Sequence, residues 1–328
     1  MSSPFFSIII PCYNVMTFID RTLKALEEQS FTDFEVVCID DCSTDGTYDY
    51  LLQKAANSII TINVYRNEVN KGPGVSRNVG IARAKGRYIG FCDGDDWLEK
   101  NALEIIHRKL DEYQSPVDIV FFNLFQVFPS GKKRRMNITS VFDLVLDTQD
   151  RVAASPDTLA CLFVSRDLLT KVPVVDLRHA EDMVMVPLLM IKAARIAYLD
   201  DALYNYCYRT SSASTTISLK VVVRFEDAFK FLMENMGSDY RTALEFLCIK
   251  LIIYGLLYNA VRCKLDNRKL KEKISMFERE FPLWFNNRYI GLLPLRKRIW
   301  ILFAKHRLFL CLRLYCNIQL LYFRISSI

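Results

Sequence analysis

A dense run of acidic side chains, Asp93-Gly94-Asp95-Asp96-Trp97, places three carboxylates within four residues. Such carboxylates repel one another unless a cation or solvent neutralises them. Because glycine permits a tight turn, Asp93 and Asp95 can point to one side, where their oxygens suit Mg²⁺ or Mn²⁺ shared with substrate phosphates. A solvated acidic turn is the other interpretation of this motif when it stands alone.

A second acidic pair, Asp40-Asp41, follows an apolar run. The carboxylate of Asp41 can accept a hydrogen bond from a nucleobase or a ribose at the edge of a sheet. Alternatively, both aspartates serve only the turn that follows, and Ser43 or Asp45 caps the next helix. The pair by itself leaves both interpretations open.

A basic, glycine-containing loop runs through Lys71-Gly72-Pro73-Gly74 to Ser76-Arg77-Asn78. Such a loop can hold a diphosphate through Lys71 and backbone amides, although it is equally compatible with an ordinary helix start. It matches neither the P-loop nor the glycine pattern of dinucleotide-binding folds, so those two classes of cofactor site lose their support.

The pair Glu181-Asp182 precedes an apolar segment with helical periodicity. One of these carboxylates can act as a general base toward an acceptor hydroxyl. The alternative is that acidic residues in a first helical turn simply interact favourably with the helix macrodipole.

The elements that must position these residues alternate between strand and helix over the first hundred residues. This alternation predicts a mostly parallel sheet, in which ligands bind beyond the carboxyl ends of the strands. Three of the predicted strand ends carry Pro11 to Asn14, Asp40-Asp41 and Asp93 to Asp96, so chemistry-bearing residues gather at one edge. The predicted strands are 6–10, 35–39, 60–65 and 88–92, and the predicted helices are 18–29, 47–56 and 78–84.

The later sequence predicts an acceptor-binding half and then a helical region. A boundary is expected near residue 215, which gives a first domain of 1–215, with a nucleotide-binding half to about residue 100 and an acceptor half from 101 to 215. Residues 216–328 are expected to form a helical, basic and apolar region. Within the acceptor half we predict strands at 117–128, 159–164 and 204–208, helices at 167–171 and 181–194, and a basic surface turn at 130–135.

Composition is that of a globular chain of 328 residues, with 51% hydrophobic and 24% charged residues. The ten cysteines show neither a CxxC pair nor zinc-ligand spacing, so we expect free thiols in a reducing compartment. No signal peptide precedes the first predicted strand, and no stretch reaches the about 20 apolar residues of a membrane span. These features predict a cytoplasmic protein.

Charge is unevenly distributed, because the segment from Phe281 to the end holds eight Lys or Arg and no Asp or Glu. A basic, aromatic tail suits an anionic membrane surface. Within it, Leu295 to Phe323 is compatible with an interfacial helix, or else with ordinary packing or an oligomer contact. The apolar helix expected at Leu247 to Val261 is more typical of a core. No nucleic-acid-binding motif accompanies the basic residues.

Taken in order, the motifs resemble the family 2 glycosyltransferases of bacterial surface-polysaccharide synthesis, which are inverting enzymes of the GT-A fold. The resemblance covers roughly residues 5 to 215, and it implies that fold followed by an α-helical extension. It also implies a nucleotide-sugar donor, most often a UDP-sugar, a saccharide or lipid-linked saccharide acceptor, and Mn²⁺ or Mg²⁺. The matching residues are Ser7 to Asn14, Asp40 to Thr47, Asn70-Lys71-Gly72, Ser76-Arg77-Asn78, Gly86 to Ile89, Asp93 to Trp97, Glu181-Asp182, Tyr206, Arg209 and Ser212 to Ser214.

The resemblance further implies roles for individual residues. The donor nucleotide is expected to contact a group of residues spread over the first domain, and Asp93 and Asp95 are expected to bind the metal. Asp182 is the expected catalytic base, with Glu181 as the fallback. Cys42 departs from the family by standing where glycine is common. The expected donor contacts are Pro11 and Tyr13 at the base, Asp41 on the nucleobase, Lys71 and Arg209 at the phosphates, and Asp93 at the ribose.

Two other functions share these features. A catalytically silent nucleotide-sugar-binding or scaffold protein of the same fold is the main alternative, although it has no chemical need for both acidic motifs. A nucleotidyltransferase also uses metal-binding carboxylates, but the sequence lacks a glycine- and arginine-rich triphosphate loop for it.

Overall fold

The computed structural model describes residues 3–138, 147–172, 175–209 and 217–326. Its contacts divide the chain into two compact units. The first comprises Met1–Leu144 and Pro156–Tyr208, and the second comprises Val145–Ser155 and Arg209–Ile328. Residues 147–155, which we expected in the first domain, thus cluster with the helical region through the contacts of α5 (Thr148–Ala153) with α9 (Arg241–Cys248).

The first unit is built on one sheet with the strand order β3-β2-β1-β4-β8-β6-β9-β5, and β7 pairs with β6. The first four of these strands are parallel, whereas β8 runs antiparallel to both β4 and β6. The sheet is therefore mixed, with its parallel half at the N-terminal motifs. The strands are β1 (Phe6–Cys12), β2 (Phe34–Asp40), β3 (Thr61–Arg66), β4 (Tyr88–Phe91), β5 (Trp97–Leu98), β6 (Ile119–Val127), β7 (Lys133–Met136), β8 (Leu162–Ser165) and β9 (Ile196–Cys207).

Helices connect and cover the strands of the first unit. The helix α1 buries Ile19, Leu23 and Leu26, whose spacing of three and four residues forms one apolar stripe. Right-handed crossovers place α3 on the face of the parallel strands opposite α1 and α2. The helices of this unit are α1 (Ile19–Glu27), α2 (Thr47–Asn57), α3 (Pro73–Arg83), α4 (Ala102–Asp111), α6 (Arg166–Leu169) and α7 (Glu181–Lys192).

The structure confirms the four N-terminal strands and the helices between them, but it corrects three details. The helix α3 begins at Pro73 rather than at Asn78, because proline fits the first turn of a helix. The basic segment expected to be a surface turn contains β7, whose pairing with β6 makes it a strand carrying exposed charges. The last strand, β9, begins at Ile196, eight residues earlier than expected.

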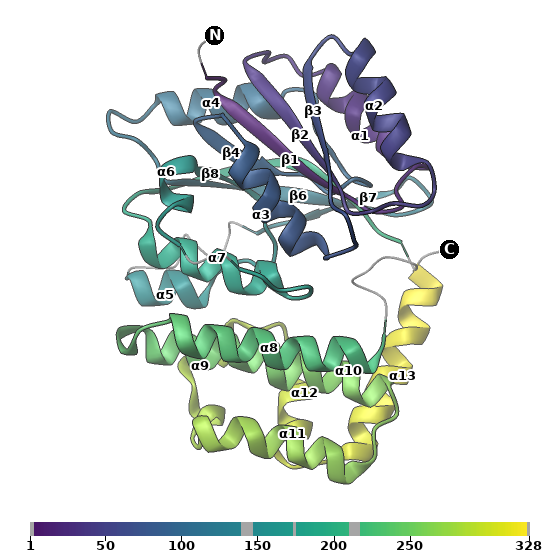
Figure 1. The fold of residues 1–328 in the computed structure, drawn as a ribbon. Coiled ribbons are helices and arrows are strands. Elements are labelled where there is room, and N and C mark those ends of the chain that lie inside the picture. Colours follow the sequence, from purple (N-terminus) through teal and green to yellow (C-terminus); the bar gives the residue numbers. More distant parts are fainter. Residues whose placement is uncertain (1–2, 139–146, 173–174, 210–216, 327–328) are drawn as a thin grey trace. The chain divides into compact units, whose positions relative to one another are not determined.

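The second unit is helical, as Figure 1 shows in green and yellow. The stretch Ser238–Arg262 corrects the expectation that no segment reaches the length of a membrane span: it has 25 residues and contains an 18-residue window with a mean hydropathy of 1.7. The chain buries 72% of that window, which is typical of a core helix. Its elements are α5 (Thr148–Ala153), α8 (Leu219–Asn235), η2 (Ser238–Tyr240), α9 (Arg241–Cys248), the π-helical η3 (Ile249–Leu256), α10 (Leu257–Arg262), α11 (Asn267–Glu280), η4 (Trp284–Asn286), η5 (Arg288–Leu292), α12 (Leu295–Lys305) and α13 (Phe309–Ser326).

Candidate active site

The carboxyl ends of β1 and β2 lie side by side, because Cys12 pairs with Asp40 in the parallel register. The loops that follow are joined by several hydrogen bonds. The backbone N–H of Asn14 donates to Ser43 Oγ at 3.0 Å, and Asn14 Oδ1 in turn accepts from the backbone of Thr44 at 2.9 Å. The N–H of Val15 donates to a threonine hydroxyl at 3.1 Å. These bonds hold the two loops at one edge of the sheet.

Asp41 organises the basic loop that precedes α3. Its carboxylate is 3% exposed and accepts hydrogen bonds from the backbone N–H of Lys71 at 3.0 Å and of Gly72 at 2.7 Å. The side chain of Asn67 donates to the same group at 2.8 Å. Gly72 has a φ of +91°, in the left-handed region that favours glycine. The structure therefore gives Asp41 a role in holding this loop, while its contact with a nucleobase stays a prediction.

The other residues expected at the donor nucleotide lie around this loop. Pro11 is near the end of β1, and Tyr13 directly follows the strand with an exposed fraction of 49%. Lys71 is exposed at the N-terminus of α3. Arg209, in contrast, belongs to the second unit, so its contact with the diphosphate stays a prediction.

The acidic run divides into one buried anchor and two partly exposed carboxylates. Asp96 is 1% exposed and accepts hydrogen bonds from Tyr204 Oη and from the N–H of Cys207, both at 2.7 Å. Burial raises the pKa of Asp96 well above its ordinary value. Asp93 and Asp95 are both partly exposed, so the third aspartate fixes the loop that presents the first two.

The backbone of the same loop is held from α1. Thr22 Oγ1 donates to the carbonyl of Asp96 at 2.7 Å, and Arg21 donates to the carbonyl of Asp95 at 2.7 Å while its guanidinium lies 3.9 Å from the centre of the Trp97 ring. The loop is thereby fixed in position relative to the sheet.

Arg77 joins the two acidic motifs. This side chain, on α3, is 7% exposed, and its guanidinium contacts Asp93 at 2.8 Å, Glu181 at 2.6 Å and Asp182 at 3.2 Å. These three carboxylates raise its pKa still further above an already high value, although burial acts in the opposite direction. One buried cation thus brings the end of β4 and the start of α7 to a common point.

Asp182 has the environment of a titratable base near neutral pH. Its pKa is raised to about 7, and burial is the largest cause. Arg77 and the N–H of Leu159 act to lower this pKa, whereas the charges of Glu181 and Asp93 act to raise it. That N–H donates to Asp182 Oδ2 at 3.2 Å. The side chain is 21% exposed, so it is not fully enclosed by the fold.

Close packing fixes the start of α7 against α3. Ala180, the residue just before Glu181, has a φ of +60°, which is strained for any residue with a Cβ. Gly74 lies so close to this turn that a Cβ there would be 2.2 Å from the carbonyl oxygen of Leu177. In the sequence Gly74 is only one residue of a glycine-containing loop, whereas in the structure it permits the contact between the two helices.

The residues present fit a hard divalent cation of the kind that shares its coordination with phosphates. Asp93 and Asp95 flank a glycine in a fixed loop, and carboxylate oxygens are the ligands that Mg²⁺ and Mn²⁺ prefer. In the described ranges no group of three or more His, Cys, Asp or Glu side chains could hold a metal by itself. Two protein carboxylates would leave the remaining coordination positions to water and donor phosphates, and the bound metal stays a prediction.

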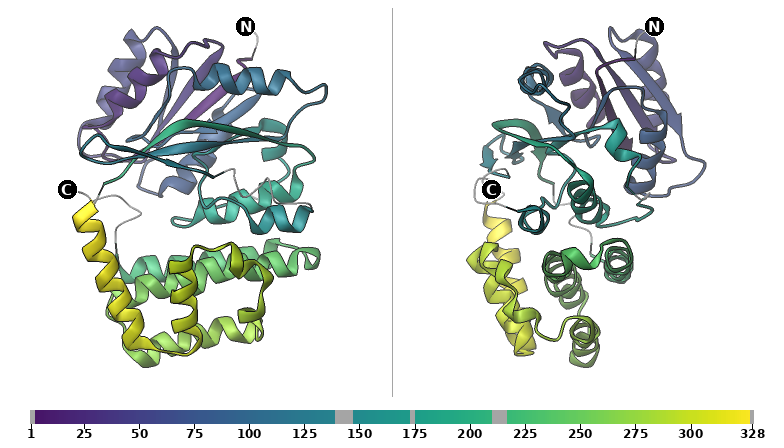
Figure 2. Two further views of the ribbon diagram at one scale, coloured as in Figure 1. Left: turned by 180° about the vertical axis from the view of Figure 1, so that it is seen from behind. Right: turned by 90° about the vertical axis from the view of Figure 1, so that its left-hand side faces the viewer.

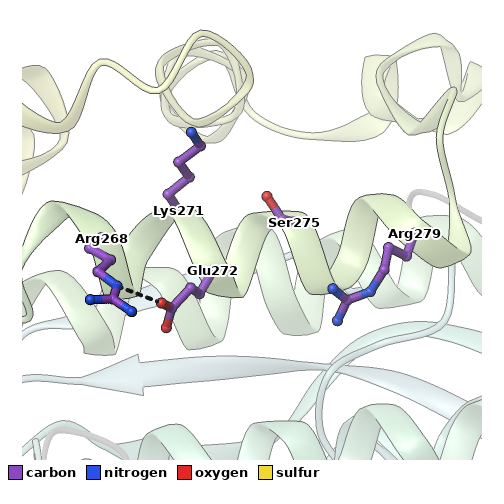
Figure 3. A pocket seen from close by; sticks show the side chains of 5 residues that line it. All are labelled: Arg268, Lys271, Glu272, Ser275 and Arg279. Atoms are coloured by element: carbon purple, nitrogen blue, oxygen red, sulfur yellow. Dashed lines mark hydrogen bonds and ion pairs between the residues drawn. The ribbon is translucent and has the colours of Figure 1, made fainter.

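The structure also contains a basic hollow that shares no residue with this site. It lies on α11 in the second unit, where Arg268 pairs with Glu272 at 3.2 Å (Figure 3). Because one helix supplies its lining and no strand end contributes, it does not resemble a donor site. Its lining residues are Arg268, Lys271, Glu272, Ser275 and Arg279.

Cys42 offers a test of the loop after β2, because it has a φ of +63° where glycine is common in the family. We expect Cys42→Gly to raise the free energy of unfolding by about 1 kcal/mol, since glycine removes the left-handed strain. Thermal unfolding measures the effect. Cys263→Gly is the matched control: Cys263 has a φ of −73°, so the same exchange there should not stabilise the chain. Equal effects at both positions would contradict the strain argument.

Comparison with known proteins identifies the family. The model described as glycosyl transferase family 2 matches residues 7–171, which is half of the chain. The chain belongs to this family. The match includes the strand ends, the Arg77 helix and the acidic run, but it ends before Glu181-Asp182.

Among relatives of this family 2 glycosyltransferase, the poly(ribitol-phosphate) beta-N-acetylglucosaminyltransferase TarS of Staphylococcus aureus is 32% identical over 61% of the chain and 35% of its own length. The putative teichuronic acid biosynthesis glycosyltransferase TuaG of Bacillus subtilis is 42% identical over 31% of the chain and 40% of its own length. The chain therefore spans well under half the length of these relatives. The matches nonetheless link it to proteins named for the synthesis of cell-surface polymers.

Solved structures confirm the GT-A-like fold of the family 2 chain. The S. aureus TarS 1–349 complex with UDP-GlcNAc aligns with a TM-score of 0.68 and 22% identity, covering 95% of this chain and 90% of that one. A mannosyltransferase of Pyrobaculum calidifontis in complex with GDP-Man and Mn²⁺ aligns with a TM-score of 0.56 and 14% identity, covering 97% and 88%. At these identities the alignments establish the fold alone.

Proposed function

We propose that this chain is an inverting glycosyltransferase that moves a sugar from a UDP-sugar to a hydroxyl of a saccharide or lipid-linked saccharide acceptor, in the synthesis of a cell-surface polysaccharide. The observation that carries the proposal is the contact of Arg77 with both Asp93 and Asp182. Arg77 thereby joins the loop that carries the expected metal ligands to the candidate base. The names of TarS and TuaG support the polymer class, and the UDP-GlcNAc bound to TarS supports the donor class.

The geometry accounts for a single displacement. Asp182 accepts the proton of the acceptor hydroxyl while the hydroxyl oxygen attacks the anomeric carbon, and the bond from that carbon to the diphosphate breaks. Attack on the side opposite the leaving group inverts the anomeric configuration without a covalent enzyme intermediate. Lys71 and the backbone N–H groups at the N-terminus of α3 are suited to bind the departing diphosphate. Asp93 and Asp95 would hold Mn²⁺ or Mg²⁺, which would further stabilise the negative charge of the diphosphate.

The proposed base predicts the pH dependence of transfer. Because the pKa of Asp182 is raised to about 7, the carboxylate is mostly protonated below that pH and cannot accept a proton. We expect kcat/KM to rise about tenfold per pH unit on the acidic side and to level off above pH of about 7. Initial rates between about pH 5.5 and 8.5 measure this profile. A rate independent of pH across that range would argue against Asp182 as the base.

We further propose that the protein acts in the cytoplasm at the inner face of the cell membrane. All ten cysteines are free thiols, in keeping with a reducing compartment. A lipid-linked acceptor would lie at that membrane, and the basic C-terminal segment suits its anionic surface. This placement brings the donor, which is soluble, and the acceptor to the same site.

Transfer to a polymer acceptor tests the proposal directly. The chain is incubated with UDP-GlcNAc, UDP-glucose or UDP-galactose, a poly(ribitol-phosphate) or teichuronic acid acceptor, and Mn²⁺, and UDP release is followed together with the product mass. We expect one donor to give a glycosylated product with the anomeric configuration opposite to that of the donor. The Asp95→Asn variant serves as the negative control for transfer. Binding of UDP without transfer or hydrolysis of any donor would favour the silent scaffold instead.

A further inference from the structure

Exposed apolar side chains concentrate in the C-terminal part of the second unit. Of the sixteen large hydrophobic residues that are exposed within the described residues, nine lie between residues 283 and 318. That segment is a small part of the chain, so the excess is local rather than a general property of the surface. The nine are Leu283, Leu292, Leu295, Ile299, Leu302, Leu308, Leu310, Leu314 and Ile318.

On α12 the exposed residues form a single stripe. Leu295, Ile299 and Leu302 follow a spacing of four and three residues, which places them within about 60° of one another around the helix. Their exposed fractions are 69%, 38% and 43%. Trp300 and Ala304 face the other way and are fully buried. The apolar stripe is therefore additional to the face by which α12 packs on its own unit.

The same pattern occurs on α13. Leu310, Leu314 and Ile318 repeat every four residues with exposed fractions of 71%, 52% and 69%, while Leu312 and Cys316 are buried. The two helices pack on each other, since the Trp300 and Tyr315 rings meet edge to face with centroids 5.3 Å apart, and they lie side by side in Figure 2. The two stripes thus belong to one packed pair of helices.

Basic residues flank the stripe on α12. Helical geometry places Arg298 about 70° to one side of its centre and Arg296 about 90° to the other, and both are exposed. Two other cations of the segment are engaged within the unit, because Arg307 pairs with Glu278 at 2.5 Å and Arg313 donates to the carbonyl of Leu265 at 2.7 Å. Arg296 and Arg298 are therefore the cations best placed to bind an external anion.

We propose that α12 and α13 form a docking surface for an anionic lipid bilayer, with the leucine and isoleucine stripes at the acyl boundary and Arg296 and Arg298 at the headgroups. An apolar stripe flanked by arginine is the arrangement of a helix that lies in a membrane interface. The segment from residue 281 onward carries eight Lys or Arg and no acidic residue, so a second copy of the same surface would be repelled. An anionic bilayer can both pair with the exposed arginines and bury the exposed apolar side chains.

The inference deepens the membrane contact of the proposed function, but its test requires no transferase activity. The full chain is sedimented with sucrose-loaded vesicles of phosphatidylcholine, either alone or with roughly 30% phosphatidylglycerol, at about 0.1 M salt. We expect binding to the anionic vesicles, weaker binding to the neutral ones, and release as salt is increased. The Ile299→Asp/Leu302→Asp variant should lose at least about tenfold in partitioning, because both side chains must then leave the acyl boundary.

Matched controls separate this surface from general adhesion. Ile59→Asp changes a side chain that is 85% exposed in the first unit, and it should leave partitioning unchanged. Arg296→Gln/Arg298→Gln should weaken binding to anionic vesicles only, whereas Arg268→Gln, in the α11 hollow, should not. The UDP-dependent thermal shift of every variant is measured in parallel, so that loss of fold or of the donor site is seen separately.

Two results would overturn the proposal. The first is a wild-type chain that binds anionic vesicles no better than neutral ones, or an Ile299→Asp/Leu302→Asp variant that sediments like wild type. The second is a wild-type chain that binds no vesicles but self-associates in analytical ultracentrifugation, when the Ile299→Asp/Leu302→Asp substitutions abolish that self-association. That result would assign the surface to a second copy of the chain.

Discussion

Asp182→Asn is expected to lower the rate of sugar transfer by about 10²–10⁴-fold while leaving the binding of UDP close to that of the wild type. Asparagine keeps the size of the side chain and can still accept from the N–H of Leu159, but it cannot take a proton from the acceptor. The loss should therefore appear in kcat rather than in the affinity for the donor.

Single-turnover transfer and UDP titration measure the two quantities on the same preparation. Asp201→Asn is the matched control, because Asp201 is an exposed carboxylate on β9 outside the Arg77 network. Glu181→Gln tests the fallback base. Full transfer by Asp182→Asn together with loss of transfer in Glu181→Gln would move the base to Glu181.

Arg77→Met is expected to lower the free energy of unfolding by about 3–5 kcal/mol, because it leaves the carboxylates of Glu181 and Asp182 without their buried cation. It should also abolish transfer, since the acidic run and the start of α7 then repel each other. Methionine retains the apolar length of the arginine stem, so a packing defect contributes little. Urea unfolding measures the effect.

The pH dependence of this loss gives a second, independent signature. Arg77 lowers the pKa of Asp182, so without Arg77 that pKa lies still further above its unfolded value, and the folded state binds more protons than the unfolded state near neutral pH. Stability must then fall as pH rises, and the loss should be larger at pH of about 8 than at pH of about 5. Arg83→Met, which removes an exposed cation from the same helix, should change stability little at either pH. A loss independent of pH would point to packing rather than to charge.

The parallel half of the fold was predictable because each of its strands is a short apolar run that ends at a polar turn. The strands that were missed or shortened lack that signal. In β9, Asp200 and Asp201 interrupt the apolar pattern, and in β7 three of the four residues are basic. Pairing with β6 keeps both in the sheet, and a long-range pairing of that kind leaves little local trace in the sequence.

The site was predictable by residue type but not by the role of each carboxylate. Asp93, Asp95 and Asp96 are chemically identical in sequence, and only the fold shows that Asp96 is the buried anchor held by Tyr204. Arg77 was noted only as part of a loop, although it contacts residues 16 and more than 100 positions away. The role of Arg77 could have been inferred from the excess of acidic residues at the predicted strand ends, because several acidic groups at one edge of a sheet require a cation.

We propose that the strand ends form a metal-assisted site for a nucleoside diphosphate. Thermal unfolding with UDP, GDP, dTDP or CDP, each with and without Mn²⁺, tests it most directly. Ligand at about 100 times its dissociation constant adds about 2.7 kcal/mol, which raises the melting temperature by a few degrees. We expect a rise with UDP that requires Mn²⁺ and is lost in Asp95→Asn. No rise with any of the four nucleotides, in a chain that unfolds cooperatively, would contradict it.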